Sequence, residues 1–158
     1  EPIGRHPKHR TKQTVSDKGK EAITSFKIQD KINGYSLLNV SLGTGRTHQI
    51  RVHLAFIGFP ILGDSVYGGR KKFATGTSEP LKKDISRFPR QALHAEKLEF
   101  IHPTLGKKVN FYAKTPKDLI NLIELLNKSG LKVSAGMFGE DMKVQSINDG
   151  PVTFLLER

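Results

Sequence analysis

The 158 residues contain no cysteine, which excludes disulfide bonds and metal sites built from thiolates. That absence fits a reducing compartment, and we expect a cytoplasmic protein. No stretch approaches the roughly 18 consecutive apolar residues that a membrane-spanning helix requires, so no membrane partner is expected. Residues 1–7 (EPIGRHP) lack the apolar segment of a signal peptide, and we expect none there.

Acidic residues are also scarce, with 15 Asp and Glu against 26 Lys and Arg, a net charge of +11. Residues 131–158 hold three basic and four acidic residues, a net of −1, so residues 1–130 carry +12. Such a surface favours a polyanion partner, because basic side chains neutralise phosphates and release counterions. The alternative is a basic protein without any polyanion partner. Because the basic residues come in runs, nucleic acid is the favoured partner.

The apolar periodicity predicts an α+β fold, with a mainly antiparallel or mixed sheet and flanking helices. Strands are expected at residues 22–29, 35–42, 92–101 and 108–113, and helices at about 47–57 and 116–129. Asn33-Gly34 is typical of a tight hairpin turn between the first two strands. Residues 5–13 are expected to form an extended arm or loop. Residues 68–90 are expected to form a long exposed loop, because they are basic and lack periodicity.

The most informative segment is GRTHQIRVH, residues 45–53, where a strand runs into a helix. Arg46 precedes this helix, and His48 and Arg51 lie three residues apart on one face of it. Free N–H groups at a helix start favour anions, so the corner can hold a carboxylate or a phosphate. The structural alternative is an arginine paired to an acid elsewhere in the chain. Spacing alone does not decide between them.

The amino-acid sequence of this segment resembles the third conserved motif of the ribosomal large-subunit pseudouridine synthases. The resemblance runs through GTGRTHQIRVHLAFIGFPILGDSVYGG, residues 43–69, and extends to EPIGRHPKHRTKQTV upstream and RQALHAEKLEFIHPTLGKKVNFYAKTPKDL downstream. It covers about residues 1–128. It implies a domain of the pseudouridine synthase type, here the C-terminal portion of the catalytic domain over residues 1–130.

The resemblance also implies a chemistry, the isomerisation of uridine to pseudouridine without cofactor or metal. In that family an aspartate attacks the nucleoside, a tyrosine stacks on the extruded base, and an arginine of the third motif pairs with the aspartate. Arg51 matches the arginine, whose fork can hold a carboxylate through two hydrogen bonds. The implied partner is RNA, with ribosomal RNA first and transfer RNA as the alternative. Nothing in the sequence indicates an oligomeric state.

Two motifs of that family are missing from these residues. The aspartate belongs to a motif like HRLDxxTSG and the tyrosine to one like KxYxA, and neither occurs here. Asp64, within GDSVYG, is interpreted as a turn residue and not as the nucleophile. We therefore expect the acidic partner of Arg51 to come from outside these residues, and the chain alone to be inactive.

Several basic residues are candidates for RNA contacts, although a solvated tail or loop would have the same composition. They are Arg5, Lys8, Arg10, Lys12, Arg46, His48, Lys71 and Lys72. His94 is interpreted as a hydrogen-bonded structural residue. A zinc site is excluded by spacing, since His48 and His53 are five residues apart and one helical face requires three or four.

Residues 131–158 instead resemble the C-terminus of the D-aminoacyl-tRNA deacylases. The resemblance places Asn148, Gly150, Pro151 and Thr153 in a pocket for the aminoacyl adenosine. The simpler interpretation is a plain hairpin of strands at 143–147 and 152–156, appended to the main domain and packed on its sheet or on a second copy. Three functions follow: a synthase fragment, a deacylase-related fusion, or a non-catalytic RNA-binding module.

Overall fold

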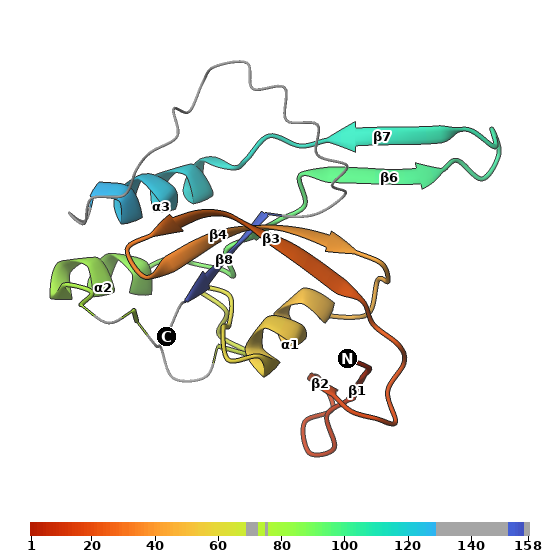
Figure 1. Ribbon diagram of the computed structural model, residues 1–158, viewed down its shortest axis with the longest axis horizontal. Helices are drawn as coiled ribbons and strands as arrows, with labels where there is room; N and C mark the ends of the chain where they lie inside the picture. Colours follow the sequence, from red (N-terminus) through yellow and green to blue (C-terminus); the bar gives the residue numbers. More distant parts are fainter. Residues whose placement is uncertain (69–72, 75, 129–151, 157–158) are drawn as a thin grey trace.

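The computed structural model describes residues 1–68, 73–74, 76–128 and the backbone of 152–156. Strands and helices alternate in short runs, which confirms the α+β class (Figure 1). The elements are β1 Ile3–Arg5, β2 Gln13–Val15, β3 Thr24–Ile32, β4 Tyr35–Leu42, α1 Gln49–Phe56, α2 Glu79–Ser86, β5 Leu93–His94, β6 Lys97–Ile101, β7 Lys108–Tyr112, α3 Lys117–Lys128 and β8 Val152–Leu156. No helix in the described part of the chain is long and apolar enough to span a membrane.

The central sheet has the strand order β3-β4-β8-β5, and all its pairs are antiparallel. Asn33 (φ 51°) and Gly34 (φ 76°) form the turn between β3 and β4, as their sequence predicts. The expected strand at 22–29 forms at Thr24–Ile32 instead, with a bulge between Ile28 and Asp30. β3 is mostly exposed, so its apolar alternation is a weak guide to its ends.

Strand β8 from the tail lies between β4 and β5. Leu38 is paired with Thr153 on one side, and Leu93 is paired with the same residue on the other. The prediction that the tail packs on the main sheet is therefore confirmed for Val152–Leu156. The expected strand at 143–147 lies outside the described residues.

The main core forms around β4, whose first four residues are all buried. A strand with consecutive buried residues is covered on both faces, because side chains alternate between them. In Figure 1, α3 is drawn above this part of the sheet and α1 below it. Leu54 of α1 and Leu126 of α3 belong to the same buried cluster as Leu38. These contacts fix α1, and with it the strand-to-helix corner.

The loop predicted at residues 5–13 is confirmed for residues 6–12, and its ends are held together because Ile3–Arg5 pairs with Gln13–Val15 in a small sheet beside α1. The loop predicted at residues 68–90 is wrong. Residues 68–90 contain α2, which buries Leu81 and Ile85. These two residues are one helical turn apart, but four charged neighbours within the helix hide so short an apolar pattern.

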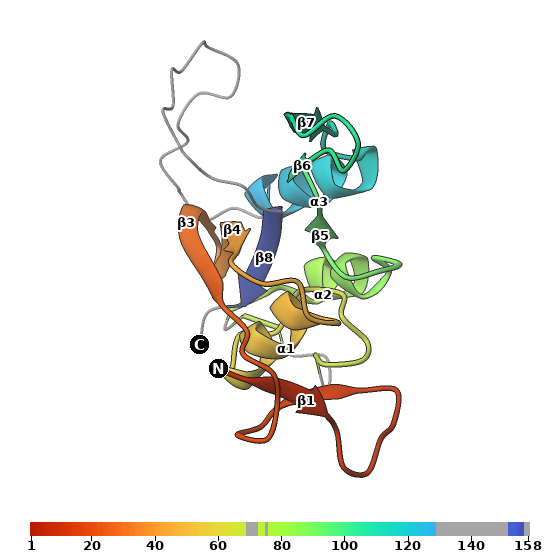
Figure 2. The same cartoon turned by 90° about the vertical axis from the view of Figure 1, so that its right-hand side faces the viewer.

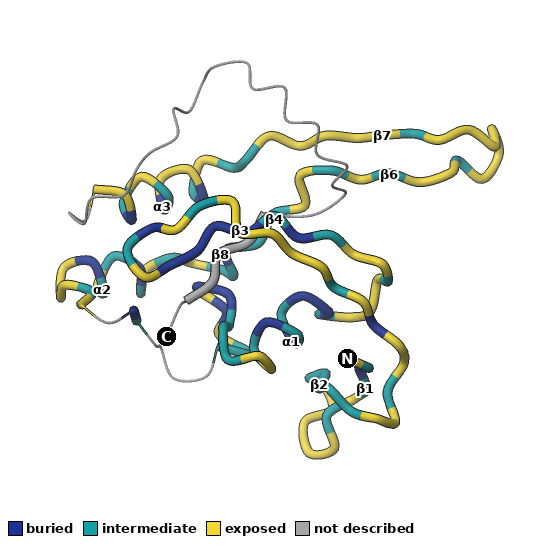
Figure 3. The backbone as a smooth tube through the Cα atoms, in the orientation of Figure 1, coloured by how far each residue is buried: buried dark blue, intermediate teal, exposed yellow. Residues whose placement is uncertain are grey.

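The β6–β7 hairpin projects from the body of the molecule (Figure 1), points toward the viewer in Figure 2, and is mostly exposed (Figure 3). The cross-strand pairs Leu98–Phe111 and Phe100–Val109 lie on one face. Lys97 and Lys108 form ion pairs with Glu99 on the other face. The hairpin is therefore amphipathic.

Candidate functional site

The corner before α1 is held in place by a buried glutamine. The Gln49 Oε1 atom accepts hydrogen bonds from the Arg46 amide (2.9 Å) and the Thr44 hydroxyl (2.8 Å). Its Nε2 atom donates to the Ile23 carbonyl (2.9 Å) and lies 3.0 Å from the Thr24 hydroxyl. Gln49 is only 3% exposed, so these bonds satisfy an amide that burial would otherwise destabilise. They fix the loop that carries Arg46 against β3.

Two residues after Gln49, Arg51 forms a two-pronged ion pair with Asp64. Nε of Arg51 donates to Oδ2 (2.8 Å), and Nη2 donates to Oδ1 (2.9 Å). The Asp64 side chain is fully buried and the Arg51 side chain is 12% exposed. The guanidinium also lies over the ring of Tyr67, with Cζ 4.9 Å from the ring centre. Such a pair is rigid, because both groups are held by several contacts.

Asp64 is fixed in turn by its own loop. Its Oδ1 accepts hydrogen bonds from the amides of Val66 (2.9 Å) and Tyr67 (3.0 Å). Burial raises the pKa of this carboxyl, but the bonds from Arg51 and the two amides outweigh burial and hold the pKa below its usual value. The bond to Asp64 raises the pKa of Arg51. Asp64 is therefore ionised at neutral pH.

Tyr67 links this pair to the helix start and to the N-terminal hairpin. Its hydroxyl lies 2.8 Å from Nδ1 of His48 and accepts a hydrogen bond from the Gln13 amide (2.9 Å). His48 has a left-handed backbone conformation (φ 57°) at the N-cap of α1. Burial and the nearby charge of Arg51 lower the pKa of His48, so its ring is neutral at physiological pH.

The expectation that Arg51 has no acidic partner within the chain is wrong. Asp64, interpreted from the sequence as a turn residue only, forms the turn and also the ion pair. The 61–64 turn that follows α1 brings Asp64 back to Arg51, whose guanidinium would be costly to leave unpaired because it is largely buried. However, Asp64 occupies only the Nε–Nη2 edge of the guanidinium. Within the described ranges no hydrogen bond is made by Nη1, so the two N–H groups of that nitrogen are not used there.

The residues predicted to contact RNA differ in their exposure to solvent. Arg5, Lys8 and Arg10 are exposed on the β1–β2 hairpin, and Arg46 is exposed at the corner. Arg46 donates from Nε to the Glu21 carbonyl (3.0 Å), which leaves its outer nitrogens toward solvent. Lys12 is half-buried and donates to the Val66 carbonyl (2.9 Å). Lys71 and Lys72 lie outside the described residues.

The two remaining histidines of interest have structural contacts. His94 lies with Nε2 3.0 Å from the Ala113 carbonyl, in agreement with the structural role predicted for it. His53 bridges the Thr24 hydroxyl (2.8 Å) and the Glu1 carbonyl (2.8 Å). Among the described residues, no group of three His, Asp or Glu side chains could hold a metal ion.

Of the deacylase-like residues, Asn148, Gly150 and Pro151 lie outside the described part of the chain. Thr153 is placed by its backbone alone, in β8 between Leu38 and Leu93. The proposed pocket is thus untested by the structure.

Sequence reasoning missed three residues that build the site: Gln49, Asp64 and Tyr67. Gln49 and Tyr67 carry no charge, so charge patterning does not select them. The signal that could have found them is their position within the segments GRTHQIRVH and GDSVYGG. The fold brings these two segments into contact, because Arg51 of the first pairs with Asp64 and lies over Tyr67 of the second.

Two family models match the chain. The model described as RNA pseudouridylate synthase matches residues 2–56, which contain the corner and Arg51. The model described as D-Tyr-tRNA(Tyr) deacylase matches residues 72–157, more than half of the chain. Residues 57–71, which contain the Asp64–Tyr67 turn, lie between the two matches and belong to neither.

Three similar curated proteins share the name ribosomal large subunit pseudouridine synthase D. The protein from Vibrio vulnificus is 44% identical over 127 residues, which is 80% of this chain and 39% of that protein. The Xanthomonas campestris protein is 41% identical over 133 residues, 84% of this chain and 40% of that protein. The Escherichia coli protein is 44% identical over 126 residues, 80% of this chain and 39% of that protein. This chain thus spans about two fifths of the length of the curated relatives it matches.

The two likenesses overlap, because any alignment of 127 of the 158 residues includes residues 72–127. The similarity to the synthases, at more than 40% identity, covers at least 80% of the chain in these two relatives and so extends well beyond residues 2–56. The chain is thus similar to RNA pseudouridylate synthases in the part that carries Arg51, and the deacylase model, which matches more than half of the chain, places residues 72–157 in the D-Tyr-tRNA(Tyr) deacylase family.

Proposed function

We propose that this chain is the arginine-bearing portion of an RNA pseudouridine synthase that isomerises uridine in large-subunit ribosomal RNA. The observation that carries the proposal is the Nη1–Nη2 edge of Arg51, available beside an edge already clamped by Asp64. The relatives' names support the same activity for proteins of which this chain resembles two fifths. No cofactor or metal enters the reaction.

In this proposal Arg51 receives the nucleophilic carboxylate on its second edge. A guanidinium has five N–H donors, enough to hold one carboxylate side-on and another end-on. Asp64 neutralises the arginine in the resting structure, so the buried charge is never unpaired. The incoming carboxylate is kept ionised by the same guanidinium, as attack on the nucleoside requires. The 158 residues hold no HRLD-type motif, so the carboxylate comes from beyond them.

The basic surface around the corner binds the RNA. Arg46 lies at the start of α1, while Arg5, Lys8 and Arg10 lie on the neighbouring hairpin. The proposed set of RNA contacts is completed by four further residues: Lys12, His48, Lys71 and Lys72. Because these contacts are to phosphates, they orient the RNA without selecting a particular uridine. The target nucleotide must be extruded from its stack to reach Arg51.

A chimera tests the activity. Residues 1–128 of this chain would replace the matching region of the Escherichia coli relative, which is 44% identical over 126 residues. Pseudouridine in ribosomal RNA from cells lacking that relative would be measured by mass spectrometry after chemical tagging. The proposal predicts pseudouridine with the chimera and none with the 158-residue chain alone. A folded chimera without product would contradict the proposal, and so would product from the chain alone that disappears with Asp64→Asn.

We also propose two units, residues 1–130 as the synthase portion and residues 131–158 as an appended deacylase-like segment. A second function, deacylation of D-aminoacyl-tRNA, is supported by the family match over residues 72–157. Release of D-tyrosine from charged tRNA by the 158-residue chain would support it. If the chain binds RNA, the chimera forms no pseudouridine and the chain releases no D-tyrosine, the chain acts as a non-catalytic RNA-binding module.

A further inference from the structure

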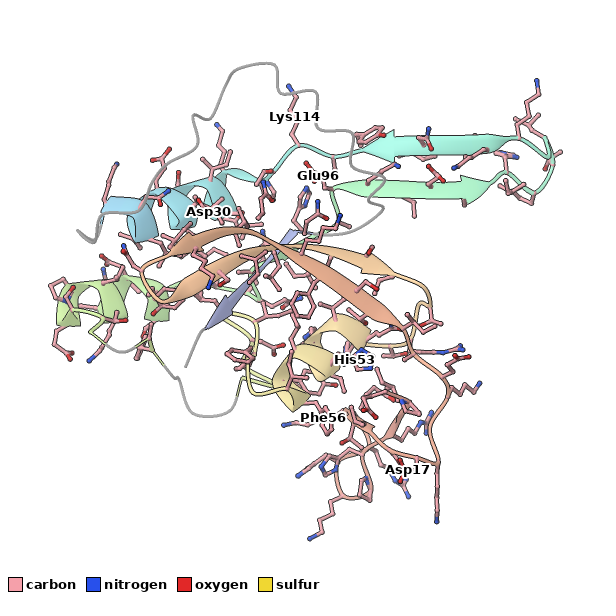
Figure 4. All side chains as sticks on the ribbon, viewed as in Figure 1. Asp17, Asp30, His53, Phe56, Glu96 and Lys114 are labelled. Atoms are coloured by element: carbon pink, nitrogen blue, oxygen red, sulfur yellow. The ribbon has the colours of Figure 1, made fainter. Side chains whose placement is uncertain are left out.

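A pocket of about 380 Å³ lies between the β1–β2 hairpin and α1. One wall comes from the hairpin and includes His6, His9 and Lys12. The opposite wall comes from α1 and includes Val52 and Phe56. Figure 4 shows Phe56 on the side of α1 that faces the hairpin. A volume in this range suits a small organic ligand with both apolar and polar parts.

The hairpin wall offers hydrogen-bond donors. The Nδ1 atom of His6 accepts from the amides of Lys8 and His9 (3.2 Å each), so a neutral His6 carries its proton on Nε2. The ring of His9 is 4.9 Å from that of His6. Lys12 uses one of its three N–H donors on the Val66 carbonyl, which holds the ammonium at the pocket wall. No acidic side chain is among the described residues that line the pocket, so this wall selects an anion.

The helix wall offers a flat apolar surface. Val52 is buried, but Phe56 is 58% exposed although it is aromatic and lies at the end of a packed helix. An exposed aromatic ring beside an ammonium group and imidazole N–H donors can bind a nucleobase by stacking and a phosphate by charge and hydrogen bonds. Tyr67 lines the same pocket and also contacts Arg51, so the pocket adjoins the proposed catalytic edge.

We propose that this pocket binds one nucleotide unit, with the phosphate at His6, His9 and Lys12 and the base against Phe56. The proposal rests on the proposed function only for its biological context, a nucleotide flanking the one that is modified. The binding itself depends on the described residues of this chain alone.

The experiment titrates the 158-residue chain with hexauridylate and, separately, with 5′-UMP, using calorimetry and amide NMR. The test variants are Lys12→Gln, which removes the charge, and Phe56→Ala, which removes the stacking surface. The matched controls are Lys27→Gln, an exposed lysine on β3, and Phe111→Ala, whose side chain is 57% exposed on the β6–β7 hairpin. Thermal melting checks that each variant is folded.

We expect each test variant to weaken hexauridylate binding about tenfold, the loss of one stacked base or one phosphate contact, with the controls within about twofold. Amide shifts should concentrate at residues 6–15 and 52–56. Tighter binding of hexauridylate than of UMP assigns the pocket to an RNA strand, and equal affinity assigns it to a free nucleotide. Both results retain the nucleotide chemistry.

The proposal is overturned if neither ligand shifts the pocket amides, or if Lys27→Gln weakens binding as much as Lys12→Gln. The second result would mean that the basic surface binds RNA without a defined site. An inactive chimera with intact nucleotide binding would count against the proposed function alone. An active chimera with no binding at the pocket would count against the pocket alone.

Discussion

The molecule contains two arginine–aspartate clamps of nearly identical geometry, Arg51–Asp64 and Arg90–Asp118. In both, Nε donates to one carboxylate oxygen at 2.8 Å and Nη2 donates to the other, at 2.9 Å or 3.0 Å. In both, the guanidinium lies near an aromatic ring, Tyr67 at 4.9 Å or Phe88 at 5.7 Å. The surroundings differ: the Asp64 side chain is fully buried, whereas that of Asp118 is 36% exposed.

The two clamps differ at the second edge of the guanidinium, the one formed by Nη1 and Nη2. Nη1 of Arg90 donates to the carbonyls of Gln91 (3.2 Å) and Leu93 (3.0 Å), so both edges of Arg90 are bound to its own chain. Arg51 makes no such bond through Nη1 with any residue of the described ranges. Identical pair geometry therefore does not imply identical roles. Arg90 fastens the segment before β5 to α3 through both edges, while the hydrogen bonds of Arg51 hold only one edge.

Asp64→Ala should have the largest effect on stability. It leaves the Arg51 charge largely buried and unpaired, and we expect a loss of about 3–5 kcal/mol of unfolding free energy. Urea denaturation followed by circular dichroism measures this loss. Asp118→Ala is the matched control at the exposed clamp. Equal losses for the two variants would show that the buried and the exposed ion pair contribute equally to stability, which would contradict the distinction made here.

Gly63→Ala should have the next largest effect, because it couples the two regions. Gly63 has φ 76°, and a Cβ there would lie 2.1 Å from the Arg90 carbonyl oxygen. We expect a loss of about 2–4 kcal/mol, from the strained backbone and the displaced loop. Gly76→Ala is the control, since Gly76 has φ 82° but nothing within 4 Å of its Cβ position. Its cost is the backbone strain alone, about 1–2 kcal/mol.

The pH dependence of stability should follow the buried clamp. The folded-state pKa of Asp64 is lowered, so its stabilisation is complete above the unfolded pKa, about 3.9, and is lost as pH falls through the folded pKa. The lowered pKa of His48 acts in the same direction, with loss beginning below about pH 6.5. Denaturation at pH 7, 5 and 3 should show a decline that is shallower for Asp64→Asn. A steeper decline in that variant would mean that Asp64 is not the group responsible.

Asp118→Ala should have the smallest effect, below about 1 kcal/mol, because solvent screens a pair that is one third exposed. The hydrogen bond from Arg90 also lowers the pKa of Asp118. Because this pair is more exposed than Arg51–Asp64, Asp118→Asn should change the loss of stability at low pH less than Asp64→Asn does. A loss above about 2 kcal/mol at this exposed clamp would show that exposure is a poor guide to the strength of these pairs.

The sequence predicted most of what depends on apolar periodicity and turn chemistry. The Asn33-Gly34 hairpin, strand β4 and helix α3 form close to where the residues indicate. Helix α2 was missed because only Leu81 and Ile85 mark its buried face among four charged residues. The Asp64 partner of Arg51 was missed because the two residues meet through a turn between α1 and the following segment, which depends on tertiary packing. Charge and spacing located the site, but they could not assign its hydrogen bonds.

The central claim is that Arg51, and not Arg90, presents a guanidinium edge to an outside carboxylate. Its most direct test is the turnover of the chimera carrying Arg51→Lys, set against Arg90→Lys in the same background. Lysine retains the charge but not the fork, so we expect Arg51→Lys to lower turnover at least a hundredfold, about 3 kcal/mol, while the chimera stays folded. Arg90→Lys should leave turnover within about threefold. Equal turnover in the two variants, or an unchanged rate with Arg51→Lys, would contradict the account.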